Sequence, residues 1–332
     1  MRFRTLGNTS LKVSEIGFGG ASIGNLFAEC THQTAMNVVN TALDTGISYF
    51  DTAPEYGYGL SERRLGDALR DKNNFVLSTK VGELLRAKHN VLPPDNKFIG
   101  KIPFHLHYDY TYDGIMRGFE DSLQRLGLHH IDMVLVHDLD PVIHDAPNFS
   151  HYFRDYVDSG YKALHELKQQ GVIHAIGLGV KKWEVCERAL AYGDYDCFML
   201  QGNYTLLEQD CLDTFLQTCL QKKISILLAG PYASGILATG ANESAYYHHR
   251  PANHDILTRV KLIEEICRAY NTAMKAVALQ FPLKHPAIAS VVIGSAAANE
   301  IHDNIKHWQS DIPASLWDAL KTEKIIPNHA PV

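Results

Sequence analysis

The chain has 332 residues, of which 45% are hydrophobic and 20% are charged, and its net charge is −6. This apolar content is enough for a large buried core, and the net negative charge argues against nucleic acid as a partner. The longest apolar runs are of strand length, shorter than the roughly 20 residues that a membrane helix needs. The first residues lack the apolar segment of a secretory signal. We therefore expect a cytoplasmic protein without a membrane partner.

The cysteines and histidines do not form a recognisable metal motif. Six cysteines are scattered without a CxxC pair, which predicts reduced, structural thiols. Two histidine pairs, His105-x-His107 and His248-His249, invite a metal interpretation. Neither pair has the i, i+4 spacing with an acid that zinc hydrolases use, and neither has companion cysteines. We expect no metal.

In chain order, the first elements predicted are the strands of a hairpin. Two short alternating segments, residues 2–6 and 11–14, flank a turn and predict a β-hairpin ahead of the main domain. After it, short apolar runs predict eight strands, at residues 16–19, 48–51, 75–79, 131–136, 175–179, 197–200, 224–228 and 290–293. Runs such as IDMVLV and ISILLA are predominantly apolar, which is typical of strands covered by helices on both faces.

Amphipathic segments between these strands predict the helices. They cover residues 31–45, 61–70, 111–126, 159–169, 183–192, 207–221, 255–270, 272–284, 299–307 and 313–323. Eight strand–helix units in one chain favour a (β/α)8 TIM barrel over an open doubly wound sheet. Because the composition never shifts to that of a linker, a single domain over residues 1–332 is predicted.

Two connecting segments, residues 82–110 and 230–254, are too long to be ordinary turns. Both follow predicted strands, which in a barrel places them at the C-terminal face, where active sites are built. Loops of this length in a compact domain usually form binding walls or lids. We therefore expect both segments to border a site.

Polar residues follow several of the predicted strands. Asp51, Lys80, His137 and Gln201 each stand at a strand end, and Tyr56 follows Asp51 in the sequence DTAPEYG. Each has an ordinary structural explanation when taken alone, such as a turn-capping acid, a surface lysine or a core histidine. A barrel brings strand ends around one mouth, so the set together predicts a catalytic site.

Proton transfer coupled to hydride transfer suits this set of groups. A free tyrosine has a pKa near ~10 and is a poor acid or base at neutral pH, but a nearby ammonium lowers that value. We expect Lys80 to lower the pKa of Tyr56, and Asp51 to hold Lys80 as an ion pair. A neutral His137 would donate a hydrogen bond to the substrate oxygen.

The segments DTAPEYG, STK and LVHD, which contain these four residues, resemble the catalytic tetrad of the aldo-keto reductases. The resemblance extends over essentially the whole chain, including FRTLGNTSLKVSEIGFG, YGLSERRLGDAL and QFPLKHPAIASVVIGSA. It implies a (β/α)8 enzyme that uses NAD(P) without a metal. It further implies that Tyr56 is the general acid/base, that Lys80 and Asp51 tune it, and that His137 orients the reacting carbonyl or hydroxyl.

The resemblance also implies contacts with the cofactor. Gln201 matches the glutamine that binds the nicotinamide carboxamide, and Asn304 matches the asparagine that contacts adenine. The other implied contacts are Gly230, Pro231, Tyr232, Ser234, Gly235 and Leu237 after the seventh strand, and Gly294, Ser295, Ala296 and Glu300 after the eighth.

This chain departs from the family pattern at three places. Gly179-Val180-Lys181 stands where most members have a Ser-Asn pair, and the tyrosine that stacks on nicotinamide is missing or displaced to Tyr232. Residues 294–300 lack the Arg or Lys with which relatives that prefer NADP bind the 2′-phosphate. Glu300 would repel that phosphate and accept a hydrogen bond from a free 2′-hydroxyl. The resemblance therefore predicts NAD in preference to NADP.

Other motifs indicate a branch of the family. DYTYDGIMRGFEDSLQRLGLHHIDMVLVHD, GLGVKKWE and GPYASGILATG are similar to the branch of L-fucose and D-threo-aldose 1-dehydrogenases, L-galactose dehydrogenase and pyridoxal 4-dehydrogenase. This implies NAD-dependent oxidation of the C1 hydroxyl of an aldose to the lactone. The candidate substrate contacts are Tyr56, His137, His105, His107, Trp183 and Tyr232.

Several alternatives remain. The chain is also compatible with a pyridoxal 4-dehydrogenase, a general aldehyde reductase, a nucleotide-binding regulatory subunit, or a barrel lyase in which Lys80 forms a Schiff base. The predicted partner in the enzymatic cases is a small sugar or aldehyde. The stereochemistry of the sugar and the formation of a homo-oligomer are left open by the sequence.

Overall fold

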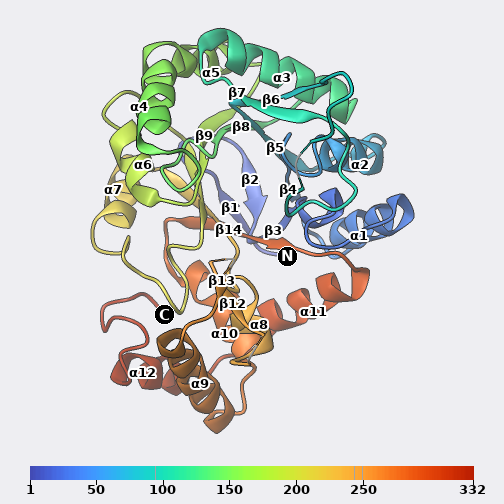
Figure 1. Ribbon diagram of the computed structural model, residues 1–332. Coiled ribbons are helices and arrows are strands. Elements are labelled where there is room, and N and C mark those ends of the chain that lie inside the picture. The colour runs from blue at the N-terminus through green and yellow to red at the C-terminus, as the bar shows by residue number, and fades with distance from the viewer. Residues whose placement is uncertain (94, 243, 249) are drawn as a thin grey trace.

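The computed structural model describes residues 1–93, 95–242, 244–248 and 250–332 (Figure 1). Within these residues, eight parallel strands close into a barrel in the order β10-β11-β14-β3-β4-β5-β8-β9. They are β3 (Ile16–Gly19), β4 (Tyr49–Asp51), β5 (Val76–Val81), β8 (Met133–His137), β9 (Ala175–Val180), β10 (Cys197–Gln201), β11 (Ser225–Ala229) and β14 (Ile288–Gly294). Each corresponds to one predicted strand, so the predicted (β/α)8 barrel is confirmed.

Helices surround the barrel on its outside (Figure 1). They include α1 (His32–Asp44), α2 (Leu60–Leu69), α3 (Tyr112–Leu126), α5 (Tyr161–Gln169), α6 (Trp183–Ala189), α7 (Phe215–Lys222), α9 (His254–Ala269), α10 (Met274–Gln280), α11 (Ala298–Gln309) and α12 (Ala314–Thr322). The threonine side chains of Thr31 and Thr111 cap α1 and α3 by accepting a hydrogen bond from the first-turn backbone. No helix in the described part of the chain is long and apolar enough to cross a bilayer.

Two predicted helix boundaries are wrong. Residues 207–209 are irregular and residues 210–214 form turns before α7, and the backbone N–H groups of Thr205 and Glu208 each donate to the carbonyl oxygen of the other. The segment before α5 contains an additional helix, α4 (Ala146–Asp155), followed by a π-helical turn, Tyr156–Gly160. Phe153 is the only buried residue of α4, so this helix contributes little to the core, and no helix was predicted there.

The predicted N-terminal hairpin is confirmed and reaches into the barrel. Strands β1 (Phe3–Thr5) and β2 (Lys12–Ser14) pair antiparallel. Leu6 and Val13 are fully buried and pack with the side chains that fill the barrel interior. A second, larger apolar core lies between the strands and the helices. The hairpin therefore fills the end of the barrel where the strands begin.

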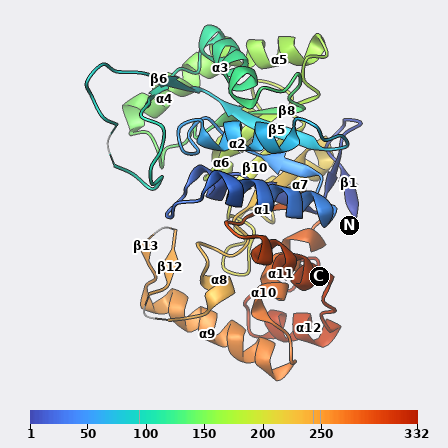
Figure 2. The same cartoon turned by 90° about the vertical axis from the view of Figure 1, so that its right-hand side faces the viewer.

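The two long connecting segments contain short elements of their own. Residues 82–110 include the antiparallel strands β6 (Glu83–Arg86) and β7 (His105–Tyr108). Residues 230–254 include α8 (Ile236–Thr239), β12 (Tyr246–Tyr247) and β13 (Arg250–Pro251). Figure 2 shows both segments projecting on one side of the molecule, opposite β1 and the N-terminus. They border the end of the barrel where the strands finish.

Candidate active site

The alternation of side chains along the strands brings the predicted polar residues to one place. Every second residue of a barrel strand faces the interior. On β8, Met133 and Leu135 pack in the interior core, so His137 points the same way at the end of the strand. On β4, Tyr49 packs in the interior core and is followed two residues later by Asp51.

Two more strands follow the same pattern. Val76 of β5 and Met199 of β10 pack in the interior core, and the same alternation leads to Lys80 and Gln201. Gly179 of β9 lies beside this layer, where an added Cβ would be in ordinary van der Waals contact with Cε of Lys80, at 3.4 Å. The neighbouring strands β4, β5 and β8, and β10 on the other side of β9, thus direct polar side chains to the mouth of the barrel.

Asp51 and Lys80 form a buried ion pair. Nζ of Lys80 donates hydrogen bonds to Oδ2 of Asp51 at 2.6 Å and to the carbonyl oxygen of Thr52 at 2.8 Å. Oγ of Ser78 donates to the other carboxylate oxygen of Asp51 at 2.6 Å. The two charged side chains are 1% and 3% exposed. The ammonium is therefore fixed in position and its charge is balanced locally.

Tyr56 lies in the turn that follows β4. Nζ of Lys80 lies 4.7 Å from the centroid of the Tyr56 ring. The Tyr56 and His137 rings meet edge to face, with centroids 5.8 Å apart. The turn requires glycine at Gly57, whose φ is +66° and whose Cβ would lie 2.4 Å from the Gly24 carbonyl oxygen.

Burial, followed by the negative charge of Asp51, raises the pKa of Tyr56 well above its ordinary value. From the sequence, we expect Lys80 to lower the pKa of Tyr56. This expectation is wrong, because the pKa is raised. The physical reason is that the Lys80 charge is already neutralised by Asp51, while the phenolate would lose hydration inside the barrel mouth. The phenol of Tyr56 is thus held protonated.

Glu83, which sequence reasoning missed, is the partner of His137. Nδ1 of His137 lies 2.8 Å from Oε2 of Glu83, and both side chains are buried. Burial opposes a charged imidazole, but Glu83 and Asp138 raise the pKa of His137. Burial also raises the pKa of Glu83. The expectation of a simple neutral histidine is corrected, because His137 shares its protonation with a buried carboxyl group.

This pairing determines what His137 offers to a ligand. With Nδ1 facing Glu83, Nε2 carries a hydrogen in two cases only. Either the imidazole is doubly protonated beside a carboxylate, or it is neutral and Glu83 donates its own proton to Nδ1. In both cases the His137–Glu83 pair as a whole carries one proton more than a neutral histidine next to an ionised carboxylate would carry. The raised pKa values of both groups favour retention of that proton.

The tetrad lines a cavity of about 240 Å³ together with several charged side chains. Two ion pairs border it, Lys97 Nζ to Glu55 Oε1 at 3.1 Å and Lys181 Nζ to Asp138 Oδ1 at 3.0 Å. Of these residues the sequence singled out only Lys181, as a departure from the family pattern. Asp138 could have been found because it directly follows His137, whereas Glu55 and Lys97 carried no local signal.

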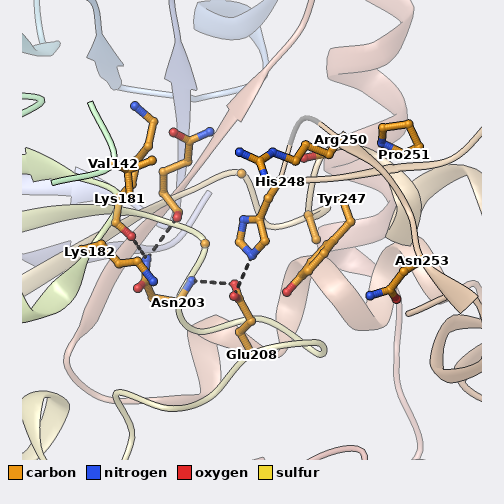
Figure 3. Close-up of a pocket in the computed structure, with 15 residues that line it drawn as sticks. Val142, Lys181, Lys182, Asn203, Glu208, Tyr247, His248, Arg250, Pro251 and Asn253 are labelled. Atoms are coloured by element: carbon orange, nitrogen blue, oxygen red, sulfur yellow. Dashed lines mark hydrogen bonds and ion pairs between the residues drawn. The ribbon is translucent and has the colours of Figure 1, made fainter. Parts of the chain in front are cut away.

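A second cavity of about 500 Å³ adjoins the first (Figure 3). Lys181, Gln201 and Gly230 line both, so the two form one continuous cleft. The hairpin β12–β13 closes one side of the larger cavity. Figure 3 shows His248 of this hairpin paired with Glu208 in the loop after β10. Nε2 of His248 lies 2.9 Å from Oε1 of Glu208.

Some predicted cofactor residues line this cleft and others lie beyond it. Gln201 and Gly230 line both cavities, Ser234 lines the larger and Gly294 the smaller. Pro231 and Leu237 are buried, and Gly235 adopts φ +95° just before α8.

The remaining predicted cofactor residues lie around the start of α11. Tyr232 donates a hydrogen bond from its hydroxyl to Oδ1 of Asn304 at 2.5 Å. Oε2 of Glu300 accepts one from the backbone N–H of Ala296 at 2.8 Å. Oγ of Ser295 is buried and has no hydrogen-bond partner among the described residues. A polar ligand group reaching Ser295 would satisfy this hydroxyl.

Four predicted substrate residues lie outside both cavities, as the described linings define them. His105 and His107 are on β7, where Nε2 of His105 lies 3.1 Å from the Val91 carbonyl oxygen and His107 is exposed. Trp183 packs against Phe215, with ring centroids 5.7 Å apart. Tyr232 is held by Asn304 as described above.

Metal ligands are best sought at the cavity rather than at the two histidine pairs. One nitrogen of His137 and one carboxylate oxygen each of Glu55 and Asp138 lie within 4.8 Å of one another. Both carboxylates are paired with lysines, so the trio resembles a charged lining more than a metal centre. His248 is paired with Glu208, and His249 lies outside the described residues.

Comparison with known proteins agrees with this geometry. The model of the Aldo/keto reductase family matches residues 15–323. The pyridoxal 4-dehydrogenase of Microbacterium luteolum is 37% identical over 333 residues, which cover 97% of each chain. The D-threo-aldose 1-dehydrogenase of a Pseudomonas species is 35% identical over 324 residues, 96% of each chain. The holo form of an aldo-keto reductase from Bacillus halodurans has a TM-score of 0.76 at 26% identity and 99% coverage of both chains.

Proposed function

Because the chain belongs to the aldo/keto reductase family, we propose that it is an NAD-dependent dehydrogenase that oxidises the C1 hydroxyl of an aldose to the lactone. The observation that carries the proposal is the cavity in which Tyr56, Lys80, Asp51 and His137 meet charged side chains. A lining with two carboxylates and two ammonium groups suits a ligand rich in hydroxyls. The similarity to a D-threo-aldose 1-dehydrogenase also supports an aldose.

Each member of the tetrad has a role in this proposal. Tyr56 accepts the hydroxyl proton of C1 during oxidation and donates it back during reduction. His137 donates a hydrogen bond from Nε2 to the reacting oxygen and so fixes its position. Lys80 and Asp51 hold a fixed charge pair beside the Tyr56 ring, which limits the reorganisation that accompanies proton transfer. When bound, the nicotinamide supplies the hydride acceptor.

The residues present fit a dinucleotide. Gln201 and Gly230 border the junction of the two cavities, which suits a nicotinamide next to the tetrad. The unpartnered Oγ of Ser295 offers a buried polar group to a ligand running toward Asn304. These contacts hold and orient the cofactor in the proposal.

The preference for NAD rests on charge near the proposed adenosine contacts. Nζ of Lys275 lies 5.5 Å from the centroid of the Tyr232 ring, but this ammonium is paired with Asp303. Glu300 adds a carboxylate at the start of α11. A 2′-phosphate would therefore meet two carboxylates and a cation that is already engaged.

Substrate and cofactor panels test the proposal. We expect NAD reduction with at least one of L-fucose, D-arabinose and L-galactose, and slower turnover with NADP at matched concentration. NAD reduction with pyridoxal but with none of these sugars would replace the aldose by pyridoxal. This second candidate is favoured by the 37% identity to a pyridoxal 4-dehydrogenase. Equal or faster turnover with NADP would refute the cofactor preference.

Substitution of Tyr56 separates an enzyme from a nucleotide-binding regulatory subunit. Tyr56→Phe should lower kcat by about 10²- to 10⁴-fold, the usual contribution of a general acid/base, with NAD binding retained. Tyr192→Phe removes a hydroxyl from an exposed side chain and serves as the control. Equal activity of the two variants would remove Tyr56 from the chemistry.

A further inference from the structure

Asp138 has a backbone conformation that turns its side chain into the substrate cavity. Consecutive side chains of a strand point to opposite faces, so a residue that follows the inward-facing His137 should point outward. Asp138 instead lines the cavity together with His137. Its φ of +46° lies in the left-handed region, and its backbone N–H donates to the Gly179 carbonyl oxygen at 3.0 Å.

This conformation is uncommon for a residue other than glycine and costs free energy. Strain of this kind persists where the surrounding structure enforces it, most often at functional sites. Here the conformation adds a second side chain from one strand end to the cavity. Asp138 is 6% exposed, so its carboxylate is largely removed from bulk water.

The charged groups around His137 are arranged as two pairs. Nζ of Lys181 lies 3.0 Å and 3.1 Å from the two carboxylate oxygens of Asp138. Nζ of Lys97 lies 3.1 Å from Oε1 of Glu55. One oxygen of each carboxylate lies within 4.8 Å of a His137 ring nitrogen. The imidazole that faces the reacting oxygen therefore has a carboxylate and an ammonium on two sides.

Such pairs match hydroxyl groups in both directions. A carboxylate accepts a hydrogen bond from a hydroxyl, and an ammonium keeps hydrogens to donate to the hydroxyl oxygen. Hydroxyls on carbons next to the reacting carbon would fall within reach of these groups. An alkyl chain in the same place would displace water from four charged groups and return no hydrogen bond.

We propose that the pairs Asp138–Lys181 and Glu55–Lys97 recognise hydroxyl groups on the carbons next to the reacting carbon. The substrate class that follows is the α-hydroxy aldehydes and their cyclic hemiacetals. This inference rests on the proposed function in that it uses the same cavity and tetrad. It adds the residues that distinguish a hydroxylated substrate from an alkyl one.

Reduction of glyceraldehyde and of propanal gives a direct test, because the two aldehydes have the same carbon chain and differ by two hydroxyls. The quantity to measure is kcat/KM for glyceraldehyde divided by kcat/KM for propanal. Either dinucleotide can be used, provided that it supports turnover. Asp138→Asn keeps the size of the side chain, and asparagine tolerates the left-handed backbone. We expect this ratio to fall by about 10- to 100-fold, as for loss of a hydrogen bond to a charged group. Glu55→Gln should change it in the same direction.

Asp67→Asn is the matched control, because it removes one charge from an exposed ion pair with Arg70 on α2. If Asp138 acted only by altering the charge of His137, kcat/KM would fall equally for both aldehydes and the ratio would stay constant. A constant ratio in both Asp138→Asn and Glu55→Gln overturns the proposal.

Failure of this inference is distinguishable from failure of the proposed function. A wild-type protein that prefers glyceraldehyde but oxidises no aldose contradicts only the C1 oxidation. A protein that oxidises an aldose while Asp138→Asn keeps the aldehyde ratio contradicts only the hydroxyl recognition. If neither aldehyde reacts, calorimetric binding of a panel of 1,5-anhydrohexitols replaces turnover. Binding weakened in Asp138→Asn supports the proposal, and no binding to the wild type overturns it.

Discussion

Nζ of Lys80 lies 2.6 Å from Oδ2 of Asp51 at a point where neither side chain exposes more than 3% of its surface. Two charges so far from water depend on each other, because a single one left there would be solvated by neither partner nor solvent. Loss of either partner alone is therefore expected to affect the stability of the fold as well as the site.

Removing one partner should destabilise the protein more than removing both. Lys80→Met leaves Asp51 buried without its counter-ion, and we expect it to lower the free energy of unfolding by about 3–5 kcal/mol. The double variant Asp51→Asn/Lys80→Met should recover part of this loss. Urea unfolding measures both, with Asp67→Asn as an exposed-pair control. A double variant less stable than Lys80→Met would contradict the interpretation.

The raised pKa of Tyr56 predicts opposite pH dependences for the two reaction directions. In the proposed mechanism, oxidation needs the deprotonated phenol of Tyr56 as a base, so its rate should rise with pH well into the alkaline range. Reduction needs the protonated phenol, which the raised pKa preserves, so its rate should vary little near neutrality. Initial rates from pH 6 to 10 in both directions check this. An oxidation rate that reaches its plateau below neutral pH would refute it.

Glu83 should make the stability of the fold depend on pH through His137. A raised histidine pKa stabilises the fold fully below its ordinary value of ~6.5, and this contribution is lost as the pH rises through the raised value. The raised pKa of Glu83 acts with the same sign. Wild-type stability should therefore decline from pH 5 to 9 relative to Glu83→Gln, as measured by urea unfolding. If the free energy of unfolding varied with pH in the same way for the wild type and Glu83→Gln, the His137–Glu83 pair would hold no extra proton in the folded state.

If NAD binds in the larger cavity as proposed, the ion pair between Glu208 and His248 should affect the rate at which NAD dissociates. It ties hairpin β12–β13 to the loop after β10, across the larger cavity. A partly exposed pair contributes little energy, so Glu208→Gln should speed NAD dissociation by about 2- to 5-fold in stopped-flow fluorescence. Asp213→Asn, which breaks an exposed pair with His329, is the control. Equal rates for both variants would mean that the hairpin does not retain the cofactor.

Much of the fold could be predicted from the sequence because its signals are local. Runs such as VLSTK and ISILLA identified buried parallel strands, and their number indicated the barrel. The position of Lys80 and His137 at strand ends followed from the same runs, since alternation then fixes the side that each faces. The short helix α4, which has little buried surface, was missed, and the start of α7 was predicted wrongly.

The parts that sequence reasoning missed depend on contacts between distant segments. Glu83 meets His137 across 54 positions because β6 continues directly from β5. Lys97 reaches Glu55 from the middle of a long loop without any regular pattern. The pKa of Tyr56 is a sum of burial and several charges, and one neighbouring ammonium could not give its sign. The charged lining of the cavity was therefore accessible only from the three-dimensional structure.

The N-terminal hairpin has a consequence for how cofactor and substrate enter and leave the site. Leu6 and Val13 pack against the side chains that fill the barrel interior, so a dinucleotide and a substrate would both enter from the end where the strands finish. Whichever molecule occupies the deeper position has to arrive first and depart last. If the nicotinamide occupies the floor beside Gln201 and Gly230, the order of binding is compulsory. The closed far end of the barrel, to which the hairpin contributes, would then set the order in which cofactor and substrate bind, although the hairpin contacts neither.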